Sequence, residues 1–104
     1  MNLGMAELER VATFFRAFSE PTRLALLQEL KSGPCSVGEL VALLPTTQAN
    51  VSKQLKILHD AGLIERRKEG TSVIYSVAEP VVMELCRIAC DKLNREARPK
   101  KLQF

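Results

Sequence analysis

Hydrophobic residues recur at intervals of three and four positions along most of the chain, which is the period of amphipathic helices. This pattern predicts five helices, over residues 5–18, 19–31, 36–44, 47–61 and 79–94. Between residues 71 and 77, apolar side chains instead alternate with polar ones, which is typical of a strand. A shorter strand pattern at 63–67 precedes it, so we expect a β-hairpin with Gly70 at its tip.

Residues that favour helix ends mark most of these boundaries. Ser19 is a candidate cap of the second helix, and Pro21 follows in the first turn, where its missing N–H costs nothing. Ser36 and Glu39 have the spacing of a capping box. Thr47 is the expected cap of the fourth helix, which we expect to end at Gly62. The fold class is therefore mainly α, with five helices and a two-stranded hairpin.

The same stripes predict which side chains are buried. In the last four helices these are Leu24, Leu27, Leu30, Leu40, Leu43, Leu44, Val51, Leu55, Leu58, Val82, Leu85, Ala89 and Leu93, with Ile88 beside them. The first helix carries Met5, Leu8, Val11, Phe14, Phe15 and Phe18. Three Phe on one short helix exceed what a small core needs. Core filling and a subunit interface, where aromatic residues are enriched, therefore both remain open.

Length and composition fit one soluble globular domain. The chain has 104 residues, of which 46% are hydrophobic and 26% charged, with a net charge of +3. No apolar run approaches the roughly 18 residues needed to cross a bilayer, and the N-terminus lacks the basic start of a signal peptide. We expect a cytoplasmic protein without membrane contact. The domain is expected over residues 1–94, followed by a basic, flexible tail at 95–104.

The fourth expected helix leaves a polar face outside its apolar stripe. That face carries Gln48, Ala49, Ser52, Lys53 and Lys56. A Gln side chain can bind adenine through two hydrogen bonds, Ser can bind several base edges, and a small Ala admits the thymine methyl group. Two helices joined by a tight turn and followed by a hairpin form a winged helix-turn-helix, whose second helix enters the major groove. The sequence therefore predicts double-stranded DNA as a partner.

Three adjacent cations, Arg66, Arg67 and Lys68, lie on the expected hairpin. Because neighbouring strand residues point to opposite faces, all three cannot contact DNA together. A solvated charged strand is one interpretation. The position beside the recognition helix favours the other, in which Arg66 and Lys68 contact phosphates or the minor groove.

Three segments resemble the ArsR/SmtB family of bacterial repressors, in the family's order and spacing: Phe18–Leu24, Thr47–Leu58 and Ala61–Arg67. The resemblance extends from about residue 6 to residue 93. It implies a homodimer built from the first and last helices, which represses by binding an inverted repeat and is released by an effector. The DNA-binding set, completed by position in the family motif, is Thr47, Gln48, Ala49, Asn50, Ser52, Lys53, Lys56, Arg66, Lys68, Gly70 and Thr71.

The metal sites that the resemblance implies are missing from this sequence. The arsenic-type site has a Cys-x-Cys pair at the start of the third helix, where this chain has Ser36 and Gly38. His59 is the one histidine, so a His-rich zinc or nickel site is excluded. The remaining candidates are Cys86 and Cys90, four positions apart on the last helix, together with Cys35.

Three interpretations of these cysteines remain open. Cβ atoms at i and i+4 of a helix lie about 5–6 Å apart, whereas a disulfide needs about 3.5–4.5 Å, so direct oxidation of Cys86 and Cys90 would strain the helix. Two thiolates at that spacing suit an arsenite-like metalloid, or a thiol or persulfide redox sensor. Structural filling is the third interpretation. Cys35 lies near a helix N-terminus, where we expect its pKa to be lowered. No cofactor beyond such a thiolate-bound metalloid is expected.

Two other classes of function fit less well. A protein-interaction module on the same fold would lose the basic and small polar residues of the fourth helix, which this sequence keeps. An enzyme is disfavoured because the chain has no Gly-rich phosphate loop, no Ser/His/Asp set and a single His. The sequence predicts a homodimeric, sequence-specific repressor rather than an enzyme.

Overall fold

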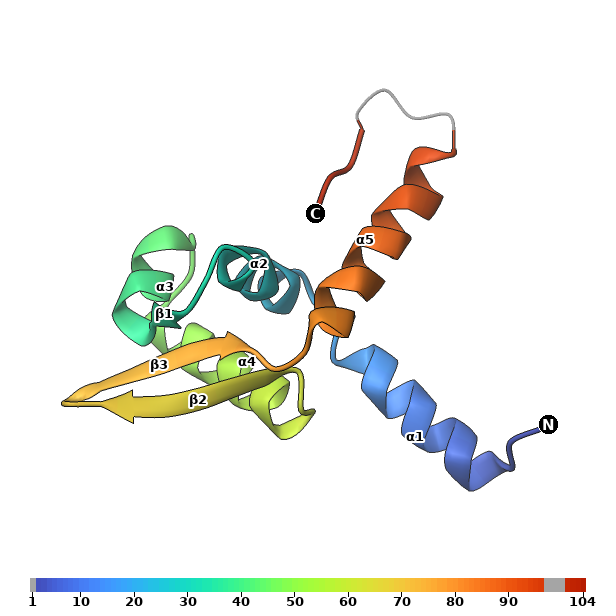
Figure 1. Cartoon of the computed structure of the whole chain (residues 1–104), viewed down its shortest axis with the longest axis horizontal. Coiled ribbons are helices and arrows are strands. Elements are labelled where there is room, and N and C mark those ends of the chain that lie inside the picture. The colour runs from blue at the N-terminus through green and yellow to red at the C-terminus, as the bar shows by residue number, and fades with distance from the viewer. Residues whose placement is uncertain (1, 97–100) are drawn as a thin grey trace.

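The computed structural model describes residues 2–96 and 101–104, and these residues form the predicted winged helix-turn-helix (Figure 1). The elements in chain order are α1 (Met5–Arg16), α2 (Pro21–Leu30), β1 (Cys35–Ser36), α3 (Val37–Leu43), α4 (Gln48–Asp60), β2 (Ile64–Glu69), β3 (Ser72–Val77) and α5 (Pro80–Asn94). The predicted fold class is confirmed. Among the described residues, no helix is long and apolar enough to span a membrane.

The capping box at the start of α3 forms as the sequence predicts. The Ser36 hydroxyl accepts a hydrogen bond from the Glu39 backbone N–H at 3.1 Å, and the Glu39 carboxylate accepts one from the Ser36 N–H at 2.9 Å. These bonds stabilise the ionised carboxylate, so they lower the pKa of Glu39 below its usual value. The capping box fixes the residue at which α3 begins.

The start of α2 differs from the prediction that Ser19 caps this helix. The N-cap is Glu20, whose carboxylate accepts hydrogen bonds from the backbone N–H groups of Thr22 at 3.0 Å and Arg23 at 3.1 Å. Ser19 instead donates its hydroxyl to the Phe15 carbonyl at 3.1 Å. The Ser19 prediction is wrong because a carboxylate on the next residue reaches two free N–H groups at once, where a hydroxyl reaches one.

The core lies where α2, α3, α4 and the sheet meet. Its largest fully buried side chains are Leu26, Leu27, Leu40, Val51, Leu55, Leu58, Leu63 and Ile64. The expected stripe is correct for α4 but shifted for α2, where Leu26 is buried and Leu24 is half-buried, because α2 packs against both α4 and β3. Leu43 was also expected inside but is 56% exposed, since the short α3 turns one side to the core.

The sheet contains one strand more than the predicted hairpin. The two-residue strand β1 pairs antiparallel with β3, which gives the order β1-β3-β2. A strand this short shows no alternation, so the sequence pattern could not reveal it. Strand β2 also runs two residues further than expected, to Glu69, which pairs with Ser72. Gly70 turns the hairpin with φ of 61°, in the left-handed region that favours glycine.

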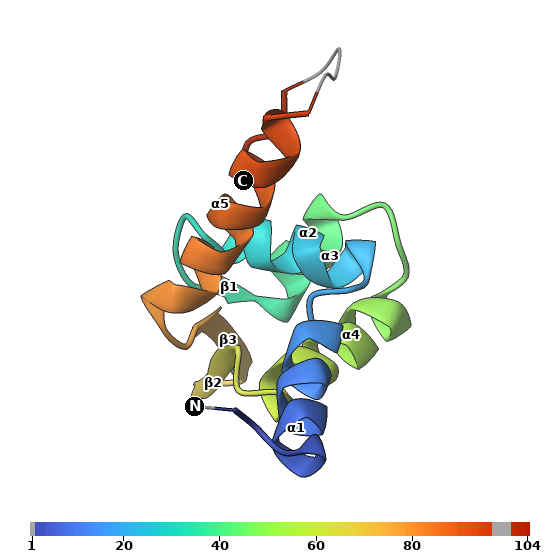
Figure 2. The ribbon, with the colours of Figure 1, turned by 90° about the vertical axis from the view of Figure 1, so that its right-hand side faces the viewer.

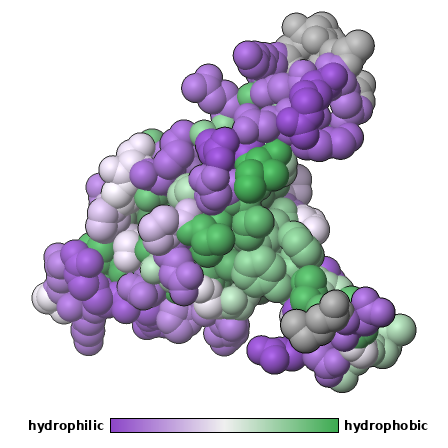
Figure 3. All heavy atoms as spheres, turned by 45° about the vertical axis from the view of Figure 1, so that its right-hand side comes forward, coloured by the Kyte–Doolittle hydropathy of each residue, from purple (hydrophilic) through white to green (hydrophobic). Residues whose placement is uncertain are grey.

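Helices α1 and α5 project from one side of this body as two diverging arms, α5 upward and α1 downward in Figure 1 (Figures 1 and 2). The radius of gyration is 15.2 Å, compared with about 13 Å for a compact chain of this length. No residue of α1 is buried, and Phe15 is 54% exposed. Hydrophobic atoms gather on the side of the body between the arms (Figure 3). The arms therefore hold apolar surface that this chain does not cover.

In α5 the buried residues are Val82 and Cys86. The expectation that Ala89 and Leu93 lie inside is wrong for the single chain, where both are exposed and Ile88 beside them is 50% exposed. The cause is the direction of α5, which meets the body near its start and then leaves it. The apolar stripe of α5 thus continues onto a free surface.

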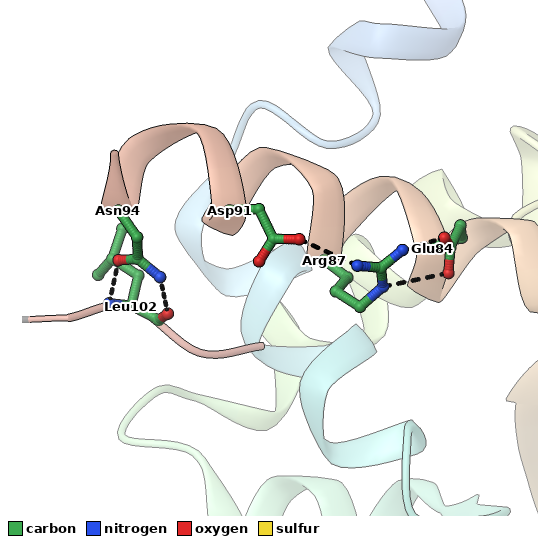
Figure 4. Close-up of polar contacts among 5 residues, drawn as sticks. All are labelled: Glu84, Arg87, Asp91, Asn94 and Leu102. Atoms are coloured by element: carbon green, nitrogen blue, oxygen red, sulfur yellow. Dashed lines mark hydrogen bonds and ion pairs between the residues drawn. The ribbon is translucent and has the colours of Figure 1, made fainter. Parts of the chain in front are cut away.

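The polar side of α5 is held by side-chain ion pairs (Figure 4). Arg87 pairs with Glu84 and, at 2.9 Å, with Asp91. Near the end of the helix, the Asn94 side chain exchanges two hydrogen bonds with the backbone of Leu102, which returns segment 101–104 toward α5. Arg98 and Lys100 of the expected basic tail lie outside the described residues.

Candidate nucleic-acid interface

Helix α4 starts at the residue that the sequence predicts. The Thr47 hydroxyl accepts a hydrogen bond from the Asn50 backbone N–H at 3.1 Å, which satisfies one of the free donors of the first turn. Gly62 follows the helix with φ of 78°, as expected for a residue that ends a helix. Both ends of α4 are therefore fixed, and its first turn faces outward beside the turn from α3.

The outer face of α4 carries the polar side chains that the sequence assigned to it. The exposed members of the predicted set on this helix and its cap are Thr47, Gln48, Ala49, Ser52, Lys53 and Lys56. The opposite face consists of Val51, Leu55 and Leu58, which are fully buried. Burial of that stripe prevents rotation of the helix and keeps the polar face directed to solvent.

Asn50 differs from the other predicted residues of α4 because its side chain is half-buried and already bonded. Its Nδ2 donates to the Thr46 hydroxyl at 3.0 Å, and its Oδ1 accepts from Gln54 Nε2 at 3.1 Å. Both ends of the amide are thus engaged within the protein. Little capacity remains for a base edge, unlike the exposed amide of Gln48.

Lys56 forms an ion pair with Asp60 one helical turn later, at 3.0 Å. The Lys56 side chain is nevertheless 77% exposed. Exposed i,i+4 pairs of this kind contribute about 0.3–0.5 kcal/mol, so a phosphate can compete with Asp60 for the lysine. Lys53, by contrast, forms no ion pair with any described residue.

The wing separates its three cations as strand alternation requires. Arg66 and Lys68 share one face of β2, and Arg67 points to the other. Arg67 is neutralised on its own face by Glu69, with Nη2 2.7 Å from Oε2. Within the described part of the chain Arg66 and Lys68 form no ion pair, which leaves both free for a polyanion. Gly70 and Thr71 form the exposed tip of the wing beyond them.

The environment of Cys35 contradicts the lowered pKa expected for this residue. Cys35 lies in β1 rather than on a helix, and its thiol donates to the Gly33 carbonyl at 3.6 Å. Burial raises the pKa of the Cys35 thiol, and the nearby carboxylates of Glu39 and Glu29 raise it further. Proximity to the start of α3 is outweighed because desolvation and negative charge both oppose a thiolate.

Cys86 and Cys90 lie on the same side of α5 but differ in access. Cys86 is buried, and its pKa is raised by burial and then by the proximity of Cys90. Cys90 is half-buried and lines an open cavity of about 420 Å³ between α5 and segment 101–104. Among the described residues, no three His, Cys, Asp or Glu side chains come together as a metal site.

Two residues of this region escaped the sequence analysis. Gln54 is the one polar side chain in the described core, and it is joined to Arg23 of α2. The available signal was the position of Gln54 three residues after Val51, on the inward side of α4. Arg23 gave no such signal, because its partners lie on other elements.

Known proteins share this architecture. Residues 18–67 match a family described as a helix-turn-helix domain. The transcriptional repressor SmtB homolog of Synechocystis sp. is 34% identical over 92 residues, which cover 88% of this chain and 70% of that protein. The crystal structure of Rv0081 from Mycobacterium tuberculosis has a TM-score of 0.79 and 34% identity, covering 90% of this chain and 93% of the other.

A second similar structure is a homodimer. This is the solution structure of a homodimeric winged helix-turn-helix DNA-binding domain, Mb0332 of Mycobacterium bovis, described as a possible ArsR-family transcriptional regulator. It has a TM-score of 0.76 and 25% identity, covering 91% of this chain and 92% of that domain.

A capped helix with a free polar face, beside a basic hairpin, defines a winged helix-turn-helix protein that binds DNA. The chain belongs to the ArsR/SmtB family of transcriptional regulators. Members of this family are regulators and not enzymes, which confirms that expectation.

Proposed function

We propose that this protein is a repressor that binds an inverted-repeat operator as a homodimer. The observation that carries the proposal is the pairing of two surfaces: the exposed polar face of α4 and the unpaired cations Arg66 and Lys68 of the wing. The repressor name of the Synechocystis relative supports the direction of regulation. Since a protein that binds operators works where the chromosome lies, we also place it in the cytoplasm.

Each proposed contact follows from side-chain chemistry. Gln48 binds adenine through two hydrogen bonds, Ala49 packs on a thymine methyl group, and Ser52 bonds to a base edge. Lys53 and Lys56 bind phosphates or guanine beside that segment. Arg66 and Lys68 hold the flanking backbone, with the wing tip at Gly70 and Thr71 near the minor groove. Thr47 contributes by fixing the start of the helix.

The homodimer is proposed to form through α1 and α5. A helix of 12 residues without one buried side chain is marginal by itself in water. The exposed apolar residues of the two arms, which include Leu8, Val11, Phe15, Ile88 and Leu93, supply the surface that a second copy would cover. A two-fold axis between copies then matches the symmetry of an inverted repeat.

The release mechanism is proposed to act through Cys86 and Cys90, with a thiol-reactive effector such as an arsenite-like metalloid or an oxidant or persulfide. The supporting observation is that Cys86 and Cys90 lie one turn apart on the same side of α5, where burial and then Cys90 raise the pKa of Cys86. Arsenite would bind as two thiols lose their protons and two hydroxyl groups leave arsenic as water. Cys90 is the accessible thiol, whereas Cys86 has to be exposed by movement of α5.

The experiment begins with selection of a duplex from a random-sequence pool by the wild-type protein. Fluorescence anisotropy then compares that duplex with a scrambled one of the same composition. Gln48→Ala with Ser52→Ala should remove the preference, because each lost base contact is worth about 1–3 kcal/mol, while binding to the scrambled duplex stays unchanged. Failure to enrich any sequence, or an unchanged preference in the double variant, would contradict the assignment.

The same assay tests release when arsenite or an organic polysulfide is added. Wild-type protein should leave the duplex, and Cys86→Ser with Cys90→Ser should stay bound. Cys35→Ser is the matched control and should still respond. Release from the Cys86/Cys90 variant would remove these residues from the mechanism while leaving the repressor intact.

A further inference from the structure

Gln54 is the polar side chain that the core of the described residues encloses, with 7% exposure. It points inward from α4 beside Val51 and Leu55. An amide without partners is expensive to bury, yet here both ends are bonded. Oε1 accepts from Arg23 Nη1 at 2.7 Å, and Nε2 donates to Asn50 Oδ1 at 3.1 Å. Gln54 thus joins one residue of α2 to another of its own helix.

Arg23 carries the connection from α4 to the end of α1. Its Nε donates to the Ala17 carbonyl at 2.8 Å, and its Nη2 donates to the Arg16 carbonyl at 3.0 Å. Carbonyls at the end of a helix lack intrahelical partners and form the negative end of its dipole, so a guanidinium is well placed there. The guanidinium is planar and rigid, so it fixes the direction of Gln54 relative to the end of α1.

Asn50 carries the connection onward to the first turn of α4. Its Nδ2 donates to the Thr46 hydroxyl in the turn that precedes the helix, and its backbone N–H donates to Thr47. The next residues outward are Gln48 and Ala49, which the proposed function assigns to base reading. One continuous series of side-chain hydrogen bonds therefore runs from the last turn of α1 to the DNA-facing turn of α4.

Packing alone does not explain this arrangement. Apolar residues of similar volume could fill the space of this hydrogen-bonded set, and replacing bonded partners together in that way is often close to neutral for stability. A fully bonded polar group instead restricts orientation, because its partners accept it in one geometry. The series also ends at α1, one of the arms proposed to form the dimer.

We infer that Arg23, Gln54 and Asn50 are positioning residues that hold the first turn of α4 at an angle set by α1. This inference rests on the proposed function and deepens it. The preference of the protein for a DNA sequence then depends on where α1 lies, and the residues that transmit this dependence contact neither DNA nor the second copy. Asn50, placed in the DNA-binding set by the sequence, acts through Thr46 and the turn rather than on a base.

The test uses Gln54→Met, Arg23→Met and the double variant, with Gln28→Met on the exposed side of α2 as matched control. Anisotropy gives the ratio of affinities for the selected and scrambled duplexes. Each single variant should lower that ratio about tenfold, and the double variant should lower it no further, because coupled residues are not additive. Binding to the scrambled duplex should stay at the wild-type level, and Gln28→Met should behave as wild type.

A second measurement needs no DNA. Hydrogen exchange of the backbone amides of Asn50 and Val51, which both donate to Thr47, should be faster in Gln54→Met than in wild type, while amides of the buried half of α4 stay protected. Gln54→Glu keeps the acceptor for Arg23 but loses the donor to Asn50, so it should speed exchange in the first turn without releasing Arg23.

These measurements separate the two ideas. Unchanged first-turn exchange in Gln54→Met, or additive losses in the double variant, would overturn the positioning network whatever the wild-type protein does with DNA. If the wild-type protein prefers no duplex but first-turn hydrogen exchange is faster in Gln54→Met as expected, the proposed function is contradicted and the positioning network stands.

Discussion

Helices α4 and α1 have nearly the same length, 13 and 12 residues, and each carries an apolar stripe, yet they lie in opposite environments. The stripe of α4 is completely buried, whereas α1 has no buried residue. The difference comes from the partners available. Helix α4 packs against α2, α3 and β2, while α1 extends away from them. The polar face of α4 is thus fixed within one chain, whereas α1 holds apolar surface that this chain does not cover.

The largest expected effect comes from a charge on the arm. Phe15→Glu should separate the dimer and lower operator affinity by about 10²–10⁴-fold, since two linked half-site contacts become independent. Sedimentation velocity and anisotropy measure the two changes. Arg10→Glu is the control, because position 10 lies on a different side of α1 from Leu8 and Phe15. A dimer that persists in Phe15→Glu would contradict the assignment of α1 to the subunit interface.

The counterpart in α4 is Leu55→Ala. Removing a fully buried side chain should lower the free energy of unfolding by about 2–5 kcal/mol, measured by urea denaturation. Leu8→Ala in α1 should cost little in the isolated monomer and should act through the concentration dependence of unfolding. Similar losses for both variants in dilute protein would mean that α1 is packed within its own chain.

A smaller effect separates the two faces of the wing. Lys68→Ala should weaken binding to the selected and scrambled duplexes alike and reduce the salt dependence of binding by about one phosphate contact. Arg67→Ala removes the same charge from the opposite face, where Glu69 already neutralises it. It should therefore change the salt dependence less. Titration of affinity against salt distinguishes them, and equal slopes would contradict the assigned faces.

The smallest expected effect concerns pH and the cap of α3. The pKa of Glu39 is lowered below its ordinary value of 4.5, so its ionised form stabilises the fold above that pH and this stabilisation is lost as pH falls through the lowered pKa. Glu39→Gln keeps the capping bonds without the charge. Urea midpoints measured from neutral to acidic pH should fall less steeply in the variant; a parallel decline would exclude this contribution.

Local chemistry made most of the recognition unit predictable. The cap at Thr47, the capping box at Ser36 and the turn at Gly70 each depend on neighbours within four residues, so the sequence carries the whole signal. The polar face of α4 followed from the period of its apolar stripe. Strand β1 and the burial of Leu26 were missed, because both depend on elements that pack from elsewhere in the chain.

The sequence by itself determined the five helices, the hairpin, the family and the outward face of α4, since periodicity and capping act over one or two helical turns. Strand alternation places Glu69 on the same face of β2 as Arg67, so Arg67 is paired while Arg66 and Lys68 form no ion pair among the described residues. Tertiary structure decided the packing partners, because α2 meets both α4 and β3 and this buries Leu26. It also decided that burial and nearby carboxylates raise the pKa of Cys35. The hydrogen bond that joins Arg23 to Gln54 spans 31 positions, and folding alone brings such distant side chains together.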